Sequence, residues 1–221
     1  MKDNFSKQAD LYAKYRPEYP REIYEHILSQ FTERSCAWDC ATGNGQVAKI
    51  LAAHFEEVKA TDISEEQLAN AEQAKNIHYS VAEAERTTFP DNHFDLVTVG
   101  QALHWFDFDE FFKEVKRVLK PNSVLAVWGY SNMLIGEEMD KLYFDFYQNI
   151  TGPYWDEERK YIDDRYESID FPFELVQSET FEMIKKWDIE TLEGFFNTWS
   201  AVQHFIIKEG YNPGKSLLEK R

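Results

Sequence analysis

A carboxylate followed by two closely spaced glycines is the clearest chemical feature of this 221-residue sequence. Asp39 ends a short apolar run, and Gly43 and Gly45 follow it directly before an apolar helical pattern. Because glycine has no Cβ, such a turn lets backbone N–H groups and a helix N-terminus approach a ligand closely. Asp39 favours a positively charged ligand, since the pyrophosphate of a dinucleotide gains little from a nearby acid. A tight turn that binds nothing is the alternative.

A second carboxylate ends the next strand-like run. Asp62 closes residues 57–62, and an acid at this distance from a glycine turn can accept hydrogen bonds from both hydroxyls of a ribose. Ser64 and Gln67 have the spacing of a capping box, which predicts the start of a helix. An exposed turn acid without a ligand is the alternative, which the nearby glycine turn disfavours.

An imidazole and an indole follow a later strand-like run. His104 and Trp105 come just after residues 94–99, and Asp107 and Glu110 predict the cap of another helix. A histidine at this point is a candidate general base for a phenol or an amine. An ordinary corner between strand and helix is the alternative interpretation.

Strand-like and helix-like runs alternate through the first 130 residues. After the glycine turn, the expected strands are 57–62, 77–81, 94–99 and 124–128. This alternation predicts right-handed crossovers and an α/β fold, with a doubly wound, mostly parallel, Rossmann-like sheet and helices on both faces. Ligands of such sheets bind at the carboxyl ends of the strands, where Asp39, Asp62, Glu83 and His104 are expected.

Two segments are expected to cover that edge of the sheet. Residues 1–19 read as an N-terminal lid, or else as a plain amphipathic helix, and residues 131–170 read as an inserted helical cap rich in aromatic and charged side chains. Residues 172–186 read as an extended pair or one long strand, and 188–206 as helix. The length fits one domain, 1–221.

The composition argues against several classes of protein. A formal net charge of -16 is unfavourable for nucleic-acid binding, which depends on basic surface. No apolar run is long enough to span a membrane, and residues 1–6 show no signal-peptide core. Cys36 and Cys40 are expected to be reduced, buried thiols of a cytoplasmic monomer or homodimer. Two cysteines alone offer too few ligands for a metal site, so none is predicted.

Taken together, these residues resemble the class I S-adenosylmethionine (SAM) dependent methyltransferases, and among them the trans-aconitate methyltransferase-like branch of the type 11 group. The resemblance covers most of the chain. The matching segments are Tyr12-x-x-x-Arg16-Pro17-x-Tyr19-Pro20, Asp39-Cys-Ala-Thr-Gly43-Asn-Gly45-Gln46, Thr61-Asp62, Ala84-Glu85, Phe89-Pro90-Asp91, Phe94-Asp95, His104-Trp105-Phe106 and Thr198-Trp199-Ser200.

The resemblance implies SAM as cofactor and a set of roles. Gln101 and His104 would lie beside the transferring methyl, Asp62 would take the ribose hydroxyls, and Glu83 and Ala84 would face the adenine. The residues implied to contact the cofactor are Tyr12, Arg16, Asp39, Thr42, Gly43, Asn44, Gly45, Asp62, Ile63, Glu83 and Ala84. The residues expected around the methyl acceptor are Trp105, Trp155, Arg159, Arg165 and Trp199.

Two departures from the family pattern stand out. The family usually has glycine where this chain has Ala41, which implies a slightly tighter fit near the cofactor. The family also usually ends with an antiparallel seventh strand between the fifth and the sixth, whereas residues 217–221 contain no strand-like run.

The acceptor is expected to be a small organic molecule, most simply a carboxylic acid that is methylated on oxygen. The guanidinium groups of Arg16, Arg159 and Arg165 suit a carboxylate, although the two later arginines could instead pair with neighbouring surface acids. The aromatic cap would equally hold a phenol ring. Two other classes stay open: a nicotinamide-dependent oxidoreductase, and a SAM-binding protein without catalysis.

Overall fold

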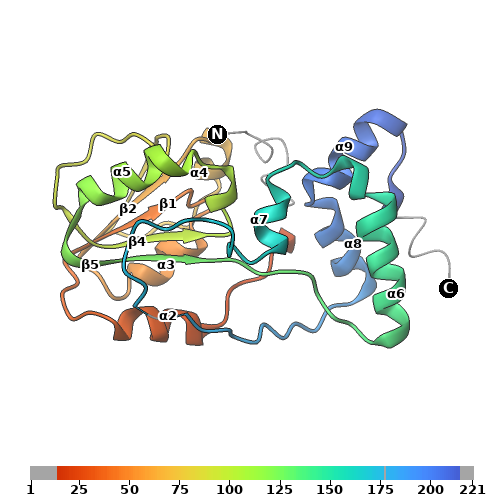
Figure 1. Cartoon of the computed structure of the whole chain (residues 1–221), viewed down its shortest axis with the longest axis horizontal. Helices are drawn as coiled ribbons and strands as arrows, with labels where there is room; N and C mark the ends of the chain where they lie inside the picture. Colours follow the sequence, from red (N-terminus) through yellow and green to blue (C-terminus); the bar gives the residue numbers. More distant parts are fainter. Residues whose placement is uncertain (1–13, 177, 215–221) are drawn as a thin grey trace.

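The computed structural model describes residues 14–176 and 178–214 (Figure 1). Its centre is a five-stranded sheet in the order β3-β2-β1-β4-β5, and every pair of neighbours is parallel. The strands are β1 (Cys36–Cys40), β2 (Glu57–Asp62), β3 (Ile77–Val81), β4 (Phe94–Gly100) and β5 (Leu119–Trp128). The α/β fold and the parallel sheet predicted from the sequence are therefore confirmed.

Helices connect the strands, and a second group lies beyond the carboxyl ends of the strands (Figure 1). Those between or before the strands are α2 (Arg21–Ser29), α3 (Gln46–Leu51), α4 (Glu65–Ala69), the short 3-10 helix η2 (Leu103–Trp105) and α5 (Phe108–Val118). Those of the second group are α6 (Glu137–Asp145), the π-helix η3 (Phe146–Ile150), the 3-10 helix η4 (Gly152–Tyr154), α7 (Arg159–Asp163), α8 (Ile189–Asn197) and α9 (Ser200–Glu209).

The alternation of side chains along β1 divides the core between the two faces of the sheet. Trp38 and Cys40 pack on one face, in a cluster that includes Phe111 and Val115 of α5. Ala37 points to the other face, into a cluster built from α2 and α3. Because successive strand residues point to opposite faces, a strand that is buried throughout needs helices on both sides, which is the doubly wound arrangement.

Local capping follows the sequence closely. The Ser64 hydroxyl accepts the Gln67 N–H at 3.1 Å and begins α4. The Asp107 carboxylate accepts the Glu110 N–H at 3.2 Å and begins α5. Each cap satisfies one N–H that has no partner inside its helix, so both helix starts could be read from four-residue patterns.

The helices beyond the sheet form a cap with a hydrophobic core of its own. Tyr143, Phe146, Phe196, Trp199 and Val202 are buried together there. Two of these side chains belong to α6 and η3, and the other three belong to α8, α9 or the residues that join them. The segment expected as the cap, 131–170, is therefore only part of it. The cap is completed by residues 189–209, which form α8 and α9.

Residues 172–186 do not form the expected strand or extended pair: none of those that the structure describes is in a strand. Leu175, Val176 and Ile184 are exposed. A strand-like pattern needs a neighbour that pairs its backbone, and within residues 14–176 and 178–214 the edge strand β5 pairs with β4 alone. The segment instead follows α2, where Glu179 lies 3.6 Å from His26.

In the part of the chain that is described, no helix has the length and apolar character needed to cross a membrane.

Candidate functional site

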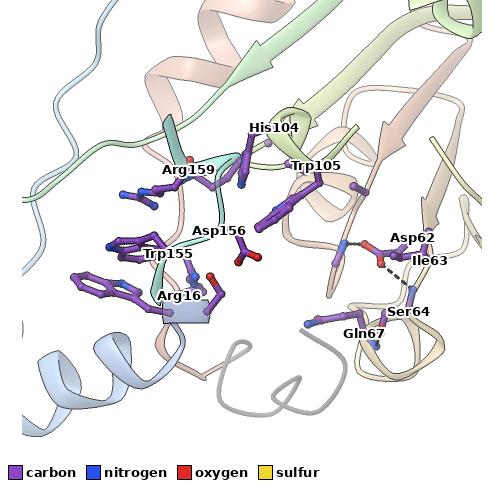
Figure 2. A pocket seen from close by; sticks show the side chains of 17 residues that line it. Arg16, Asp62, Ile63, Ser64, Gln67, His104, Trp105, Trp155, Asp156 and Arg159 are labelled. Atoms are coloured by element: carbon purple, nitrogen blue, oxygen red, sulfur yellow. Dashed lines mark hydrogen bonds between the residues drawn. The ribbon is translucent and has the colours of Figure 1, made fainter. Parts of the chain in front are cut away.

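A pocket opens at the carboxyl ends of the strands, between the sheet and the cap (Figure 2). Asp62, Ile63, Ser64 and Gln67 form one wall, and His104, Trp105, Trp155 and Arg159 lie across from them. A smaller pocket over the glycine turn shares Arg16, Ala41, Gly43 and Gly100 with the first. The two hollows are therefore neighbours at the edge where parallel sheets bind ligands.

The glycine turn has the backbone that its sequence predicts. Gly43 and Gly45 have φ values of 56° and 81°, and Gly45 is the N-cap of α3. A Cβ on Gly45 would lie 2.2 Å from the Tyr79 hydroxyl, so this position also needs glycine for space. Ala41 has φ 53°, which is a left-handed conformation. It stands where the family usually has glycine.

Asp39 holds this turn together from inside. It is 1% exposed, and its carboxylate accepts hydrogen bonds from the hydroxyls of Thr42 and Thr98 and from the Ala48 N–H. Burial raises the pKa of Asp39 to about 6, against the lowering effect of these donors. Although Asp39 lines the smaller pocket, the contacts that the structure shows for it position the loop.

Asp62 and Gln67 form a polar wall. One Asp62 oxygen accepts the Gly43 N–H and the other accepts the Ser64 N–H, each at 2.9 Å, which aims the carboxylate at the pocket (Figure 2). Gln67 is 3% exposed, and its side-chain oxygen is buried without a hydrogen-bond partner among the described residues. A buried acceptor without a donor is costly, so this wall fits a ligand that brings donors, as the hydroxyl-bearing and ammonium-bearing SAM does.

His104 lies on the opposite wall. It is 7% exposed, and its Nδ1 lies 3.1 Å from the Tyr166 hydroxyl. Burial, with smaller contributions from the nearby Arg159 and Arg16 guanidinium groups, lowers the pKa of His104 from 6.5 to about 3. The imidazole is therefore neutral at pH 7 and is a weak base, which reduces its value for the deprotonation of a phenol or an amine.

Replacing His104 by Gln should make the fold less sensitive to acid. A histidine whose folded pKa is depressed stabilises the fold above about pH 6.5, and this contribution is lost as the pH falls toward 3. Between pH 7 and pH 5 the loss is on the order of 2 kcal/mol. Urea unfolding of both proteins at both pH values measures it. Equal losses of unfolding free energy in the two proteins would contradict the depressed pKa.

Two arginines give the cap side of the pocket its positive charge. The Arg159 Nε donates to the Tyr147 hydroxyl at 2.7 Å, and the guanidinium lies 4.6 Å from the centre of the Trp155 ring. Arg16 donates to the Tyr130 hydroxyl at 2.5 Å and to the Thr198 carbonyl at 3.2 Å. Both side chains are held in place by these contacts and both line the pocket.

Most of the residues predicted from the sequence line one of the two pockets. These are Arg16, Asp39, Thr42, Gly43, Asn44, Asp62, Ile63, Gln101, His104, Trp105, Trp155, Arg159 and Trp199. Gly45, Glu83, Ala84 and Arg165 line neither, and Tyr12 lies outside the described residues. Glu83 and Arg165 are exposed, whereas Ala84 is buried. The structure thus does not bring Arg165 to the acceptor side or Glu83 to the walls described above.

Gln101 lines the pocket, but its amide is engaged with the backbone. Its Oε1 accepts the Tyr130 N–H at 2.6 Å, and its Nε2 donates to the Tyr130 carbonyl at 3.2 Å. These two bonds join the ends of β4 and β5. The contacts therefore support a positioning role for Gln101 rather than direct chemistry.

Three residues that the structure brings to this site have no site role predicted from the sequence. The sequence marks Gln67 only as part of a capping box, and it does not single out Asp156 or Tyr166. Asp156 lines the pocket beside Trp155, which no local pattern indicates. Tyr166 reaches His104 across 62 residues of sequence, so only the tertiary structure reveals the pair.

Comparison of the sequence with known proteins gives a consistent result. A family described as a methyltransferase domain matches residues 38–127. A Dictyostelium discoideum protein that is named a methyltransferase is 36% identical over 208 residues, with 92% of this chain and 79% of that protein covered. A Schizosaccharomyces pombe protein named an uncharacterized methyltransferase is 30% identical over 210 residues, with 90% and 79% covered.

Solved structures agree. A protein from Anaeromyxobacter dehalogenans, described as a type II methyltransferase, has a TM-score of 0.83 at 32% identity and covers 93% of this chain, with 87% of its own length matched. One from Anabaena variabilis, at 18% identity and a TM-score of 0.51, covers 65% of this chain and 59% of its own, and shows the fold alone. With such relatives along most of its length and this glycine turn at its centre, the chain belongs to the class I SAM-dependent methyltransferases.

Proposed function

We propose that this methyltransferase transfers the methyl group of SAM to a carboxylate oxygen of a small organic acid. The observation that carries the proposal is Arg159, whose guanidinium lies in the wall of the pocket that faces Asp62 (Figure 2). Its Nε lies 3.5 Å from the Asp163 carboxylate, so one neighbouring acid pairs with it as the sequence allowed, while the side chain still lines the pocket. Its guanidinium has five N–H donors in a planar fork that matches a carboxylate. The resemblance to the trans-aconitate branch supports the same class of acceptor.

The local charge supports an acid in spite of the overall charge of -16. At physiological salt the Debye length is about 8 Å, so distant surface acids are largely screened. Arg16 and Arg159 are close enough to depress the pKa of His104, which indicates a positive potential at that wall. Asp156 lines the same pocket and carries a negative charge there, so an acid is expected to bind nearer to the two arginines than to Asp156.

The chemistry of an acid acceptor suits the neutral His104. When bound, SAM supplies a methyl group on a sulfonium, which is ready for displacement. A carboxylate is ionised at pH 7 and needs no general base, so a weakly basic imidazole is no disadvantage. The chain then contributes position and the exclusion of water, through the indole rings of Trp105, Trp155 and Trp199 at the pocket wall.

We further propose that Asp62 receives the ribose hydroxyls and that the backbone from Thr42 to Gly45 receives the methionine end of SAM. The charge of -16 supports a protein without nucleic-acid partners, and the two free, buried cysteines fit a cytoplasmic protein. A monomer or homodimer remains our proposal for its oligomeric state. Family membership favours methyl transfer over the nicotinamide-dependent oxidoreductase, and the formed pocket beside the cofactor edge favours catalysis over SAM binding alone.

Replacing Arg159 by Gln should raise the KM for the best acid about 10-fold, because a hydrogen bond to a charged group contributes roughly 1.5–3 kcal/mol and partial exposure reduces this. The experiment screens small acids, phenols and amines with labelled SAM and then compares the variants on the best acceptor. Arg165→Gln is the matched control, since Arg165 is exposed and lines neither pocket; its KM should not change.

Competition sharpens the test. The primary amide of the best acid keeps its shape and loses its charge, so it should compete poorly with the acid in the unchanged protein and lose this disadvantage in Arg159→Gln. An uncharged best acceptor, or equal KM values in Arg159→Gln and Arg165→Gln, would show that the proposed acceptor class is wrong.

A further inference from the structure

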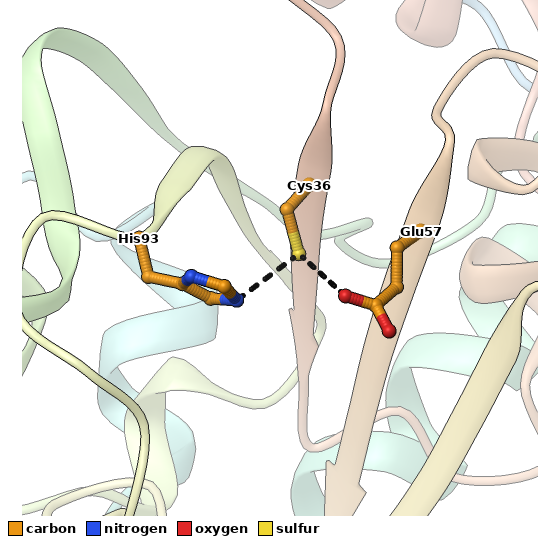
Figure 3. A group of neighbouring side chains, drawn as sticks. All are labelled: Cys36, Glu57 and His93. Carbon is orange, nitrogen blue, oxygen red and sulfur yellow. Dashed lines mark hydrogen bonds between the residues drawn. The ribbon is translucent and has the colours of Figure 1, made fainter.

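Three side chains with metal-binding atoms meet at the opposite edge of the sheet from the pocket (Figure 3). Cys36 is the first residue of β1, and Glu57 is the first residue of β2 and its direct partner in register. His93 directly precedes β4, the other neighbour of β1. The amino ends of three adjacent strands therefore bring a thiol, a carboxylate and an imidazole together.

The spacing of these atoms matches a tetrahedral zinc site. The Cys36 Sγ lies 3.6 Å from the His93 Nε2 and 3.8 Å from the Glu57 Oε2, and the three ligand atoms all lie within 4.8 Å of one another. Zn–S, Zn–N and Zn–O bond lengths at a tetrahedral angle place sulfur about 3.6 Å from both nitrogen and oxygen. The observed geometry is thus close to what the ion would require.

The carboxylate is already oriented for binding through one oxygen. The Glu57 Oε1 accepts from the Lys59 ammonium at 2.6 Å and lies 3.1 Å from the His78 Nε2, whereas Oε2 faces the thiol. A metal-binding carboxylate commonly has its second oxygen hydrogen-bonded in this way. Lys59 and His78 would therefore support the ligand rather than displace the ion.

The backbone under the cluster is fixed as well. The Cys36 N–H donates to the Asp95 carboxylate at 2.9 Å, and the His93 N–H donates to the Val118 carbonyl at 2.7 Å. Cys36 is 4% exposed, while Glu57 and His93 are partly exposed, so an ion can reach the thiol from the outer side. Ligands held by strand ends need little rearrangement on binding.

We propose that Cys36, Glu57 and His93 bind one divalent transition-metal ion of the zinc type, with water in the fourth position. Soft sulfur combined with nitrogen and oxygen is a ligand set that suits Zn²⁺ or Co²⁺ and is unsuited to Mg²⁺ or Ca²⁺. Such an ion would join the amino ends of three strands, at the end of the sheet opposite the pocket.

The test titrates Zn²⁺ into the full, reduced and chelator-treated chain against a chromophoric chelator. We expect one ion per chain. The Zn²⁺ affinity should fall in Cys36→Ser and in His93→Gln by more than the roughly 10–100-fold that is lost when a residue hydrogen-bonded to a metal ligand is replaced. The matched controls are Cys40→Ser, the other buried cysteine, and His54→Gln, an exposed histidine; both should bind as the unchanged protein does.

Co²⁺ supplies a direct readout of the sulfur. A thiolate-to-cobalt absorption band should appear in the unchanged chain and in Cys40→Ser, and be absent in Cys36→Ser, whose fold and SAM binding are checked separately. Zn²⁺ should also raise the melting temperature of the unchanged chain and leave that of Cys36→Ser where it is. Equal Zn²⁺ affinity in Cys36→Ser, or no cobalt–thiolate band in the unchanged chain, would overturn the proposal.

Discussion

Gly45→Ala should destabilise the protein by about 2–5 kcal/mol and weaken SAM binding with it. The left-handed φ of 81° costs a residue with a Cβ about 1–2 kcal/mol. The new methyl would stand 2.2 Å from the Tyr79 hydroxyl, and overpacking of this kind costs about 1–3 kcal/mol more. Tyr79 cannot move freely, because its hydroxyl donates to the Glu72 carbonyl at 2.5 Å.

A matched control separates the two contributions. Gly210 has φ 80°, and among residues 14–176 and 178–214, apart from its own chain neighbours, no atom lies within 4 Å of the position that a Cβ would take there, so Gly210→Ala should show the backbone cost alone. Denaturant unfolding of both variants gives the difference, and adding Tyr79→Phe to Gly45→Ala should recover part of it, since the closest atom is removed. If Gly45→Ala and Gly210→Ala lose the same free energy, the steric role of Tyr79 is disproved.

Asp62→Ala should lower the affinity for SAM about 10- to 100-fold, or roughly 1.4–2.7 kcal/mol. The substitution removes the acceptor proposed for two ligand hydroxyls, each worth roughly 1.5–3 kcal/mol if counted alone. It also frees the Gly43 N–H, which Asp62 holds at 2.9 Å, so the glycine turn loses a fixed point. The two effects overlap and do not add in full.

Calorimetry with SAM and with its demethylated product measures this loss directly. Asp62→Asn keeps the size of the side chain and one acceptor oxygen, so its affinity should lie between those of Asp62→Ala and the unchanged protein. Asp170→Asn, at an exposed aspartate that lines neither pocket, is the control for a change of charge. Unaltered SAM affinity in Asp62→Ala would remove Asp62 from the cofactor site.

The features that sequence predicted well are those encoded within a few residues. The glycine turn, the Ser64 cap and the acids at strand ends all depend on neighbours in the chain or on the common edge of a parallel sheet. The failure at 172–186 has the opposite cause, because a strand exists only when another strand pairs with it. Leu175 and Val176 have the residue types of a strand, yet they are exposed and find no such partner among the described residues.

The cap shows the same limit at the level of single side chains. Arg159 and Arg165 look equivalent in sequence, but α7 ends at Asp163 and Arg165 has φ 59°. The chain therefore turns away, and of the two only Arg159 lines the pocket. Contacts such as those of His104 with Tyr166 and of Cys36 with His93 join residues 62 and 57 positions apart, a distance at which sequence spacing carries no signal.

The separate core of the cap has a consequence for how this enzyme can diverge. Trp199 belongs to that core and also reaches the pocket, where its ring centre lies 5.3 Å from that of Trp155. Asp62 and the glycine turn are built instead on the sheet. With the methyl donor proposed at Asp62 and the glycine turn and the acceptor proposed at the cap, a duplicated gene can accumulate changes around Phe196 or Trp199 that reshape the proposed acceptor wall while selection keeps the donor's side intact. Substitutions confined to the cap can then change the acceptor without passing through an inactive variant that no longer binds SAM.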